Sequence, residues 1–181
     1  MSNLPQGLTT GTWNLDASHS QLGFSVRHAG ISKTRGRFGE AEGTLTVGES
    51  VETSSTEITI HVPSVDTRSE GRDQHLRSAD FFDAENYPAM TFVSTSAAGE
   101  GDAWTLTGNL TIKDVTREVE LEVEFNGAAT DPFGTQRVGF SAETTINRKD
   151  FGLTWNAALE TGGVLVSDKV KIEIEAEFAK A

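Results

Sequence analysis

Apolar and polar residues alternate along most of this chain, as they do in β-strands that are buried on one face and solvated on the other. The pattern begins with Leu22, Phe24 and Val26. The same period of two predicts seven further strands, within residues 43–47, 57–62, 90–92, 104–112, 118–125, 138–146 and 169–178. Strands of this kind predict an antiparallel sheet with one dry and one wet face.

One helix is predicted between the third and fourth strands. Thr67 and Glu70 have the spacing of a capping box, in which the Thr67 hydroxyl accepts from the Glu70 amide and the Glu70 carboxylate reaches back to the amide of Thr67. This start predicts a helix of about ten residues that ends near Ser78.

Two architectures bury the dry face of such a sheet. One is a sandwich with a solid core, and the other is an up-and-down barrel, which at about eight strands holds side chains or one small ligand. Successive strands joined by short turns favour the barrel. The 181 residues contain no repeat and no linker, so we expect one domain over residues 11–181, preceded by a flexible segment at residues 1–10.

The composition narrows the range of partners. Fifteen Lys and Arg residues against 27 Asp and Glu residues give a net charge of −12, which argues against nucleic acid or an anionic membrane surface as the main partner. The absence of cysteine excludes disulfides, thiolate zinc sites and a cysteine nucleophile. No signal-peptide pattern and no apolar run long enough for a membrane helix occur, so we expect a cytoplasmic protein without stable membrane insertion.

Positive charge is concentrated near the first predicted strand. Residues 17–39 contain no Asp or Glu, and their cations are Arg27, Lys33, Arg35 and Arg37. One interpretation is a hairpin that holds the phosphate or carboxylate head group of a ligand, with His28 nearby. The other is that these cations pair with acidic residues elsewhere on the surface.

The predicted helix carries a second basic group, Arg72 and His75. One interpretation is that one of these side chains faces a cavity at the end of a barrel. The other is that Arg72 and Asp73 form a structural pair that ties the helix to the barrel. Trp155 lies in a connection between predicted strands, where a bulky aromatic residue caps a barrel or lines its mouth.

The sequence lacks motifs for catalysis or metal binding. The four histidines, at positions 19, 28, 61 and 75, form no H-E-x-x-H motif, and no serine lies in a G-x-S-x-G turn. There is also no P-loop, so we expect no cofactor and no metal. Two alternatives stay open: an enzyme that acts on a small amphiphile with His28 or His75 as general base, and a solid β module that binds a protein.

Seven short motifs occur in an order that resembles the YceI-like family, from about residue 11 to the C-terminus. They are Asp16-x-x-His19-Ser20, Ser64-Val65-Asp66-Thr67, Arg72-Asp73-x-His75-Leu76, Asp80-Phe81-Phe82-Asp83, Tyr87-Pro88-x-Met90-Thr91-Phe92, Gly108-x-Leu110-Thr111-Ile112-Lys113 and Asn147-Arg148-x-Asp150-Phe151-Gly152. Each motif is weak alone, but seven in order make a strong match. The chain departs from the family pattern at Asp114, where glycine is more frequent.

The resemblance implies both a fold and a function. The fold is an extended eight-stranded, lipocalin-like antiparallel barrel whose tunnel takes a long amphiphile, typically a polyisoprenoid or an isoprenoid quinone. The function is non-enzymatic binding and carriage or storage of that lipid, with a link to stress in some members. Many members are periplasmic or secreted and many are dimeric, so a homodimer is one oligomeric state open to this chain.

Position and period select candidate residues for this tunnel. The candidate wall residues are Leu22, Phe24, Val26, Leu45, Ile58, Ile60, Phe92, Leu106, Leu121, Phe140, Trp155 and Ile172. The candidates for contact with a head group are His28, Arg35, Arg37, Arg72 and His75. An apolar wall with a few polar anchors at its mouth would hold the tail of the lipid and orient its head group.

Overall fold

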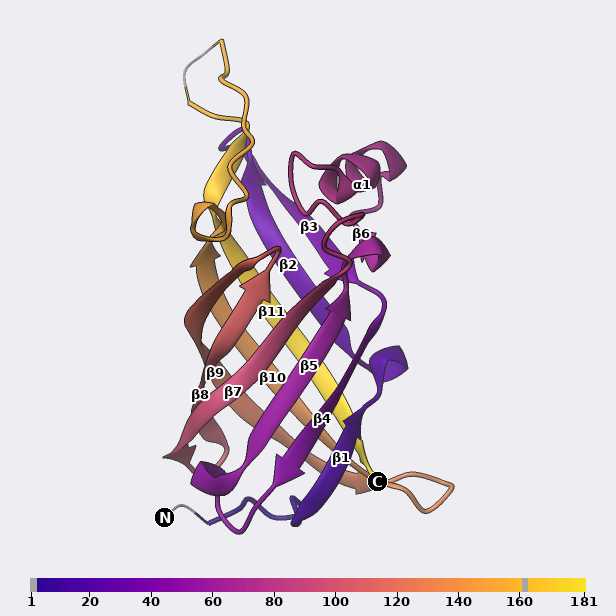
Figure 1. Cartoon of the computed structure of the whole chain (residues 1–181). Helices are drawn as coiled ribbons and strands as arrows, with labels where there is room; N and C mark the ends of the chain where they lie inside the picture. Colours follow the sequence, from indigo (N-terminus) through magenta and orange to yellow (C-terminus); the bar gives the residue numbers. More distant parts are fainter. Residues whose placement is uncertain (1–2, 161–162) are drawn as a thin grey trace.

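The computed structural model describes residues 3–160 and 163–181. Its strands form one antiparallel sheet that closes into a barrel (Figure 1). The strands are β1 (Gly11–Leu15), β2 (Gln21–His28), β3 (Ser32–Phe38), β4 (Ala41–Val47), β5 (Ser55–His61), β6 (Val65–Asp66), β7 (Ala89–Glu100), β8 (Ala103–Ile112), β9 (Val115–Thr130), β10 (Gln136–Asn147) and β11 (Val166–Lys180). The described helices are α1 (Glu70–Arg77) and four short 3-10 helices, η1 (Ala17–His19), η2 (Val51–Thr53), η3 (Val62–Ser64) and η4 (Arg148–Phe151).

The long strand β11 closes the barrel by pairing with two strands in succession along one edge. β1 pairs with residues 178–180 of β11, and β2 pairs with residues 166–175. β1 and β2 are therefore two halves of one long strand that η1 divides. β3 likewise continues into β4, with only residues 39–40 between them. With each of these pairs counted as one strand, and with the two-residue β6 left out because it pairs with β3 alone, the barrel has eight strands. This confirms the predicted fold class of a lipocalin-like antiparallel barrel with one α-helix.

The hydrophobic pattern does not predict β1, β3 or β6. In β3 the inward positions are Thr34, Gly36 and Phe38, because Gly36 lies opposite the inward-facing Phe24 of β2. A strand with so few large apolar residues gives no clear period of two. It is held in the barrel by its hydrogen-bonded ladder with β2, whose apolar alternation is strong.

Helix α1 begins at Glu70, later than the predicted start, and the capping-box prediction is wrong. Its N-cap is Ser69, whose side chain makes no capping hydrogen bond. The Thr67 hydroxyl donates to Oδ1 of buried Asp73 at 2.5 Å, and the Thr67 amide donates to the same oxygen at 2.8 Å. A buried carboxylate is a stronger acceptor than a side chain exposed to water, so Asp73 takes the contacts that the sequence assigned to Glu70.

The core lies inside the barrel and is rich in aromatic side chains. The rings of Trp104, Phe125, Phe140 and Phe178 contact one another in series, with centroids 5.4 Å apart for Phe125 and Phe140 and 6.0 Å apart for Phe140 and Phe178. Trp13 is fully buried, and its Nε1 donates to the carbonyl oxygen of Thr9 at 3.0 Å. The outer faces carry the polar half of the alternation, as expected from the sequence.

The stretch before β1 packs against one end of the barrel. Leu8 is buried and Leu4 packs against the core, so residues that the sequence sets apart from the domain contribute to its interior. The described residues before β1 lie at the lower end of the barrel in Figure 1, away from α1. Among the described residues, no helix combines the length and apolar character that crossing a membrane would need.

Candidate ligand-binding cavity

The barrel encloses an apolar cavity of about 290 Å³. Its lining includes Leu4 and Leu8 from the segment before β1, and Leu153 and Val166 from the connection after η4 and the start of β11. The first segment lies at the lower end of the barrel in Figure 1 and the second at its upper end. The polar side chains in the described lining are those of Ser54, Ser55, Thr56, Thr144 and Arg148. A hollow, nearly hydrocarbon interior does not match the alternative of a solid β module, whose inward side chains would fill the space between the sheets.

The structure places every candidate wall residue except Trp155 around this cavity. The lining candidates are Leu22, Phe24, Val26, Leu45, Ile58, Ile60, Phe92, Leu106, Leu121, Phe140 and Ile172. They share the inward parity of their strands, which is why the period of two selected them. Their contact with a ligand stays a prediction.

Trp155 lies behind the cavity wall. Its ring packs against His75, with centroids 4.6 Å apart, and against Phe81, with centroids 5.4 Å apart. Phe81 lines the cavity, so Trp155 supports a lining residue from outside. Trp155 itself is not among the residues that line the cavity, although the sequence selected it as a wall residue.

None of the five head-group candidates lines the cavity. Arg35 lies opposite Ser25 and Arg37 opposite Gly23, both with the parity opposite to the inward-facing Phe24. Because side chains alternate across a strand, the two arginines lie on the outer face of the barrel. His28 is exposed at the end of β2.

Arg72 and His75 hold α1 in place. The Arg72 guanidinium donates to the hydroxyl and carbonyl oxygens of Thr67 at 2.7 Å and 2.6 Å. Asp73 binds the same residue, so the Arg72–Asp73 dipeptide ties the helix to the segment after β6, as the structural interpretation expects. His75 Nε2 lies 2.8 Å from Oδ2 of Asp80, and its ring contacts Phe81.

Arg148 is the one ionisable side chain in the described lining, and the sequence did not select it as a site residue. It is 3% exposed and donates to the carbonyl oxygens of Leu153 at 2.7 Å, Trp155 at 2.8 Å and Ser167 at 2.9 Å. Burial lowers the pKa of this guanidinium, and Asp168, 3.9 Å away, opposes that shift. Backbone carbonyl oxygens therefore accept the hydrogen bonds that the Arg148 guanidinium would otherwise donate to a ligand.

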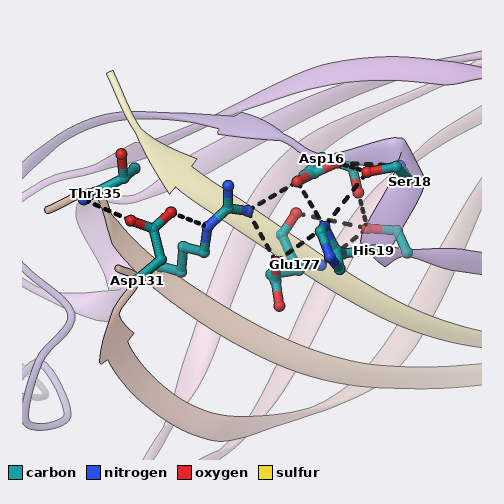
Figure 2. Close-up of polar contacts among 8 residues, drawn as sticks. Asp16, Ser18, His19, Asp131, Thr135 and Glu177 are labelled. Carbon is teal, nitrogen blue, oxygen red and sulfur yellow. Dashed lines mark hydrogen bonds and ion pairs between the residues drawn. The ribbon is translucent and has the colours of Figure 1, made fainter. Parts of the chain in front are cut away.

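A polar cluster around η1 and the adjoining strands β10 and β11 includes a serine, a histidine and an aspartate (Figure 2). His19 Nδ1 lies 2.9 Å from Oδ2 of Asp16 and 3.3 Å from the Ser18 hydroxyl. A catalytic triad needs the serine and the carboxylate on different ring nitrogens, so this cluster is not one. Neither His28 nor His75 lines the cavity, so neither is placed to act as general base on a ligand inside it.

The same cluster brings three potential metal ligands, on Asp16, His19 and Glu177, within 4.8 Å of one another. Arg137 Nη1 already donates to Asp16 at 2.8 Å and to Glu177 at 2.9 Å, and its Nε donates to Asp131 at 2.9 Å. The guanidinium supplies the positive charge that a metal ion would otherwise bring. Hydrogen bonds from Ser18, His19 and Arg137 lower the pKa of Asp16, while Asp16 raises the pKa of His19.

Comparison with known proteins identifies a common domain. A family model described as a YceI-like domain matches residues 13–178. A UPF0312 protein of Staphylococcus epidermidis is 41% identical over 170 residues, which cover 92% of this chain and 96% of the relative. A UPF0312 protein of Staphylococcus aureus is 37% identical over 172 residues, with the same coverage.

Solved structures share the fold. The YCEI protein of Campylobacter jejuni is 31% identical with a TM-score of 0.74, covering 86% of this chain and 90% of that one. BcnA of Burkholderia cenocepacia is 24% identical with a TM-score of 0.78, over 90% of this chain and 98% of that one. A polyisoprenoid binding domain from Saccharophagus degradans, 16% identical with a TM-score of 0.71, covers 93% of this chain and 98% of that one.

Proposed function

Because this chain belongs to the YceI-like family, we propose that its barrel binds the tail of a long isoprenoid lipid, a polyprenyl chain or an isoprenoid quinone, and carries or stores it unchanged. The observation that carries the proposal is the cavity of about 290 Å³ with its almost wholly apolar lining. The related fold of a polyisoprenoid binding domain in Saccharophagus degradans supports the choice of ligand class.

Burial of hydrocarbon supplies the affinity. At about 25 cal/mol per Å², roughly 600 Å² of tail surface contributes on the order of 15 kcal/mol before the costs of ordering and association. Arg148 is the one charged group in the described lining, and its guanidinium already donates hydrogen bonds to backbone carbonyl oxygens. We therefore expect the length of the tail, more than the charge of the head group, to set the affinity.

A titration of the purified chain tests this function. Polyprenyl phosphate and an isoprenoid quinone of equal tail length are added, and binding is followed by native mass spectrometry and by the fluorescence of Trp104, which lines the cavity. Saturable binding of both ligands with similar affinity is expected. Failure to bind either one, together with no amphiphile in an organic extract of the protein, would overturn the proposal.

Two substitutions in β10 separate cavity binding from contact with the outer surface. Ala142 lines the cavity, so Ala142→Phe fills space that the tail needs and should weaken binding about tenfold or more. Thr145 has the outward parity and is exposed, so Thr145→Phe adds the same side chain outside the cavity. Equal losses in the two variants would show that the tail does not enter the barrel.

A further inference from the structure

The outer face of the β2–β3 hairpin is basic on a protein whose net charge is −12. Arg27 lies opposite Lys33, and Arg35 and Arg37 follow on the same face of β3. These four residues are called the basic hairpin face below. Ser25 lies between Arg35 of β3 and Lys171 of β11. It is small and buried, so the longer cationic side chains surround it.

Most of this charge is not neutralised locally. Within the described residues, Arg37 has an acidic partner, Asp66, at 3.8 Å, whereas Arg27, Lys33 and Arg35 have none within 4 Å. The interpretation that these cations pair with acidic residues elsewhere therefore holds for Arg37 alone. Three unpaired cations on adjacent strands attract an anionic partner at short range, and screening over about 8 Å at physiological salt weakens repulsion from distant acidic residues.

An exposed apolar side chain marks the tip of the same hairpin. Ile31, in the turn between β2 and β3, is 85% exposed. The Ala29 amide donates to the Leu165 carbonyl oxygen at 2.7 Å, so the turn is joined to the connection before β11, where Val164 is 49% exposed. Both segments lie at the upper end of the barrel in Figure 1.

We propose that this end of the barrel docks peripherally on an anionic lipid bilayer. The basic hairpin face meets the phosphate groups of the lipids, and Ile31 enters the interface between head groups and acyl chains. Unpaired cations beside a single protruding apolar residue fit a surface that is anionic above and apolar beneath. The partner differs from the cavity ligand, so the inference does not depend on what the cavity binds.

The opposite end of the barrel offers an internal control. Phe133, in the turn between β9 and β10, is 92% exposed, a fraction similar to that of Ile31. Its neighbour in the turn is acidic, because the Phe133 amide donates to the carboxylate of Asp131. Asp131 is paired with Arg137, so this end presents an exposed aromatic residue without a cluster of unpaired cations. Lys180 lies near the C-terminus at the same lower end (Figure 1), where its Nζ donates to the Thr9 hydroxyl.

Sedimentation with vesicles tests the proposal on the full chain. Vesicles of phosphatidylglycerol and phosphatidylcholine should bind the protein at physiological salt, vesicles of phosphatidylcholine alone should not, and high salt should release it. Lys33→Gln with Arg35→Gln should lower the vesicle partition coefficient about 25-fold, because each cation contributes roughly a factor of five. Ile31→Ser should lower it severalfold, whereas Lys180→Gln and Phe133→Ser should leave it unchanged.

Several results would overturn the proposal. These are equal binding to neutral and anionic vesicles, no binding to either, or an equal loss in Phe133→Ser and Ile31→Ser. Retention on a polyanionic resin without vesicle binding would also overturn it, by assigning the face to an acidic macromolecule. Tail uptake in the titration described above is measured without vesicles, so failure of one proposal leaves the result for the other intact.

Discussion

The Nη1 atom of Arg137 donates to Oδ2 of Asp16 at 2.8 Å and joins β10 to the residue that precedes η1. The joint lies where the long strand formed by β1 and β2 is interrupted. Asp16 also accepts from the Ser18 amide at 3.0 Å and from the Ser18 hydroxyl at 2.6 Å. One carboxylate therefore caps η1 and fixes it to the neighbouring strands.

Asp16→Asn should lower the free energy of unfolding by about 1 kcal/mol at neutral pH, because a charged acceptor is lost. The pKa of Asp16 is lowered in the folded chain, so its contribution is full above the ordinary value of about 4 and disappears as the pH falls through the folded value. The difference between the wild type and Asp16→Asn, measured by urea unfolding, should therefore shrink in strong acid. The exposed Glu85→Gln is the control and should show no such difference.

His19 reports on the same joint with the opposite sign. Its pKa is raised chiefly by the hydrogen bond that its Nδ1–H donates to Asp16, so its contribution is present below about pH 6.5 and is lost as the pH rises through the folded value. In Asp16→Asn, an NMR titration should show the His19 pKa moving down toward 6.5. An unchanged His19 pKa would contradict this account of the cluster.

Arg148→Met should lower the free energy of unfolding by about 3 kcal/mol, because several buried carbonyl oxygens lose their donor. The carbonyl oxygens of Leu153 and Trp155 belong to the connection between η4 and β11, and that of Ser167 lies at the start of β11, so amide hydrogen exchange should quicken in this region first. Lys149→Met is the matched control, since Lys149 is exposed and its ion pair with Asp168 spans 3.4 Å at the surface. Similar losses in the two variants would contradict a structural role for the buried guanidinium.

Gly36→Ala should disturb the cavity wall from behind. A Cβ at this position would overlap Cζ of Phe24 and lie 2.8 Å from Cγ2 of Thr67. The Phe24 ring lines the cavity and would have to move, so we expect a loss of about 1–3 kcal/mol in stability and weaker tail binding.

Gly71→Ala is the companion to this change. Gly71 lies in α1 with open space around its Cα, so the substitution should raise the free energy of unfolding by about 0.5–1 kcal/mol through helix propensity. Tail binding should stay the same, because Gly71 does not line the cavity. Thermal unfolding and the quinone titration measure both effects in both variants.

The sequence predicts the barrel and most of its wall because each long strand has a strict apolar side. Leu22 and Ile172 were selected by that period alone, and both line the cavity. β3 has no such signal, so the outward direction of Arg35 and Arg37 was not recognised. Had β3 been predicted, the alternation along it would have placed both arginines on the outer face.

Arg148 was missed for a different reason. A single arginine in a sequence gives no sign of burial, since most arginines lie at the surface. Its position inside the barrel depends on carbonyl oxygens from the connection to β11, which local pattern does not bring together. The same holds for Asp73, whose partner Thr67 appeared to belong to a helix cap.

Leu4 and Leu8, in the segment before β1, line the cavity and form its floor at the end away from α1. If the proposed tail enters from the α1 end, we expect it to reach as far as these leucines and any further isoprene units to remain outside. Under the proposed function, the affinity should therefore rise with each added isoprene unit until the tail reaches Leu4 and Leu8, and should stay level for longer tails.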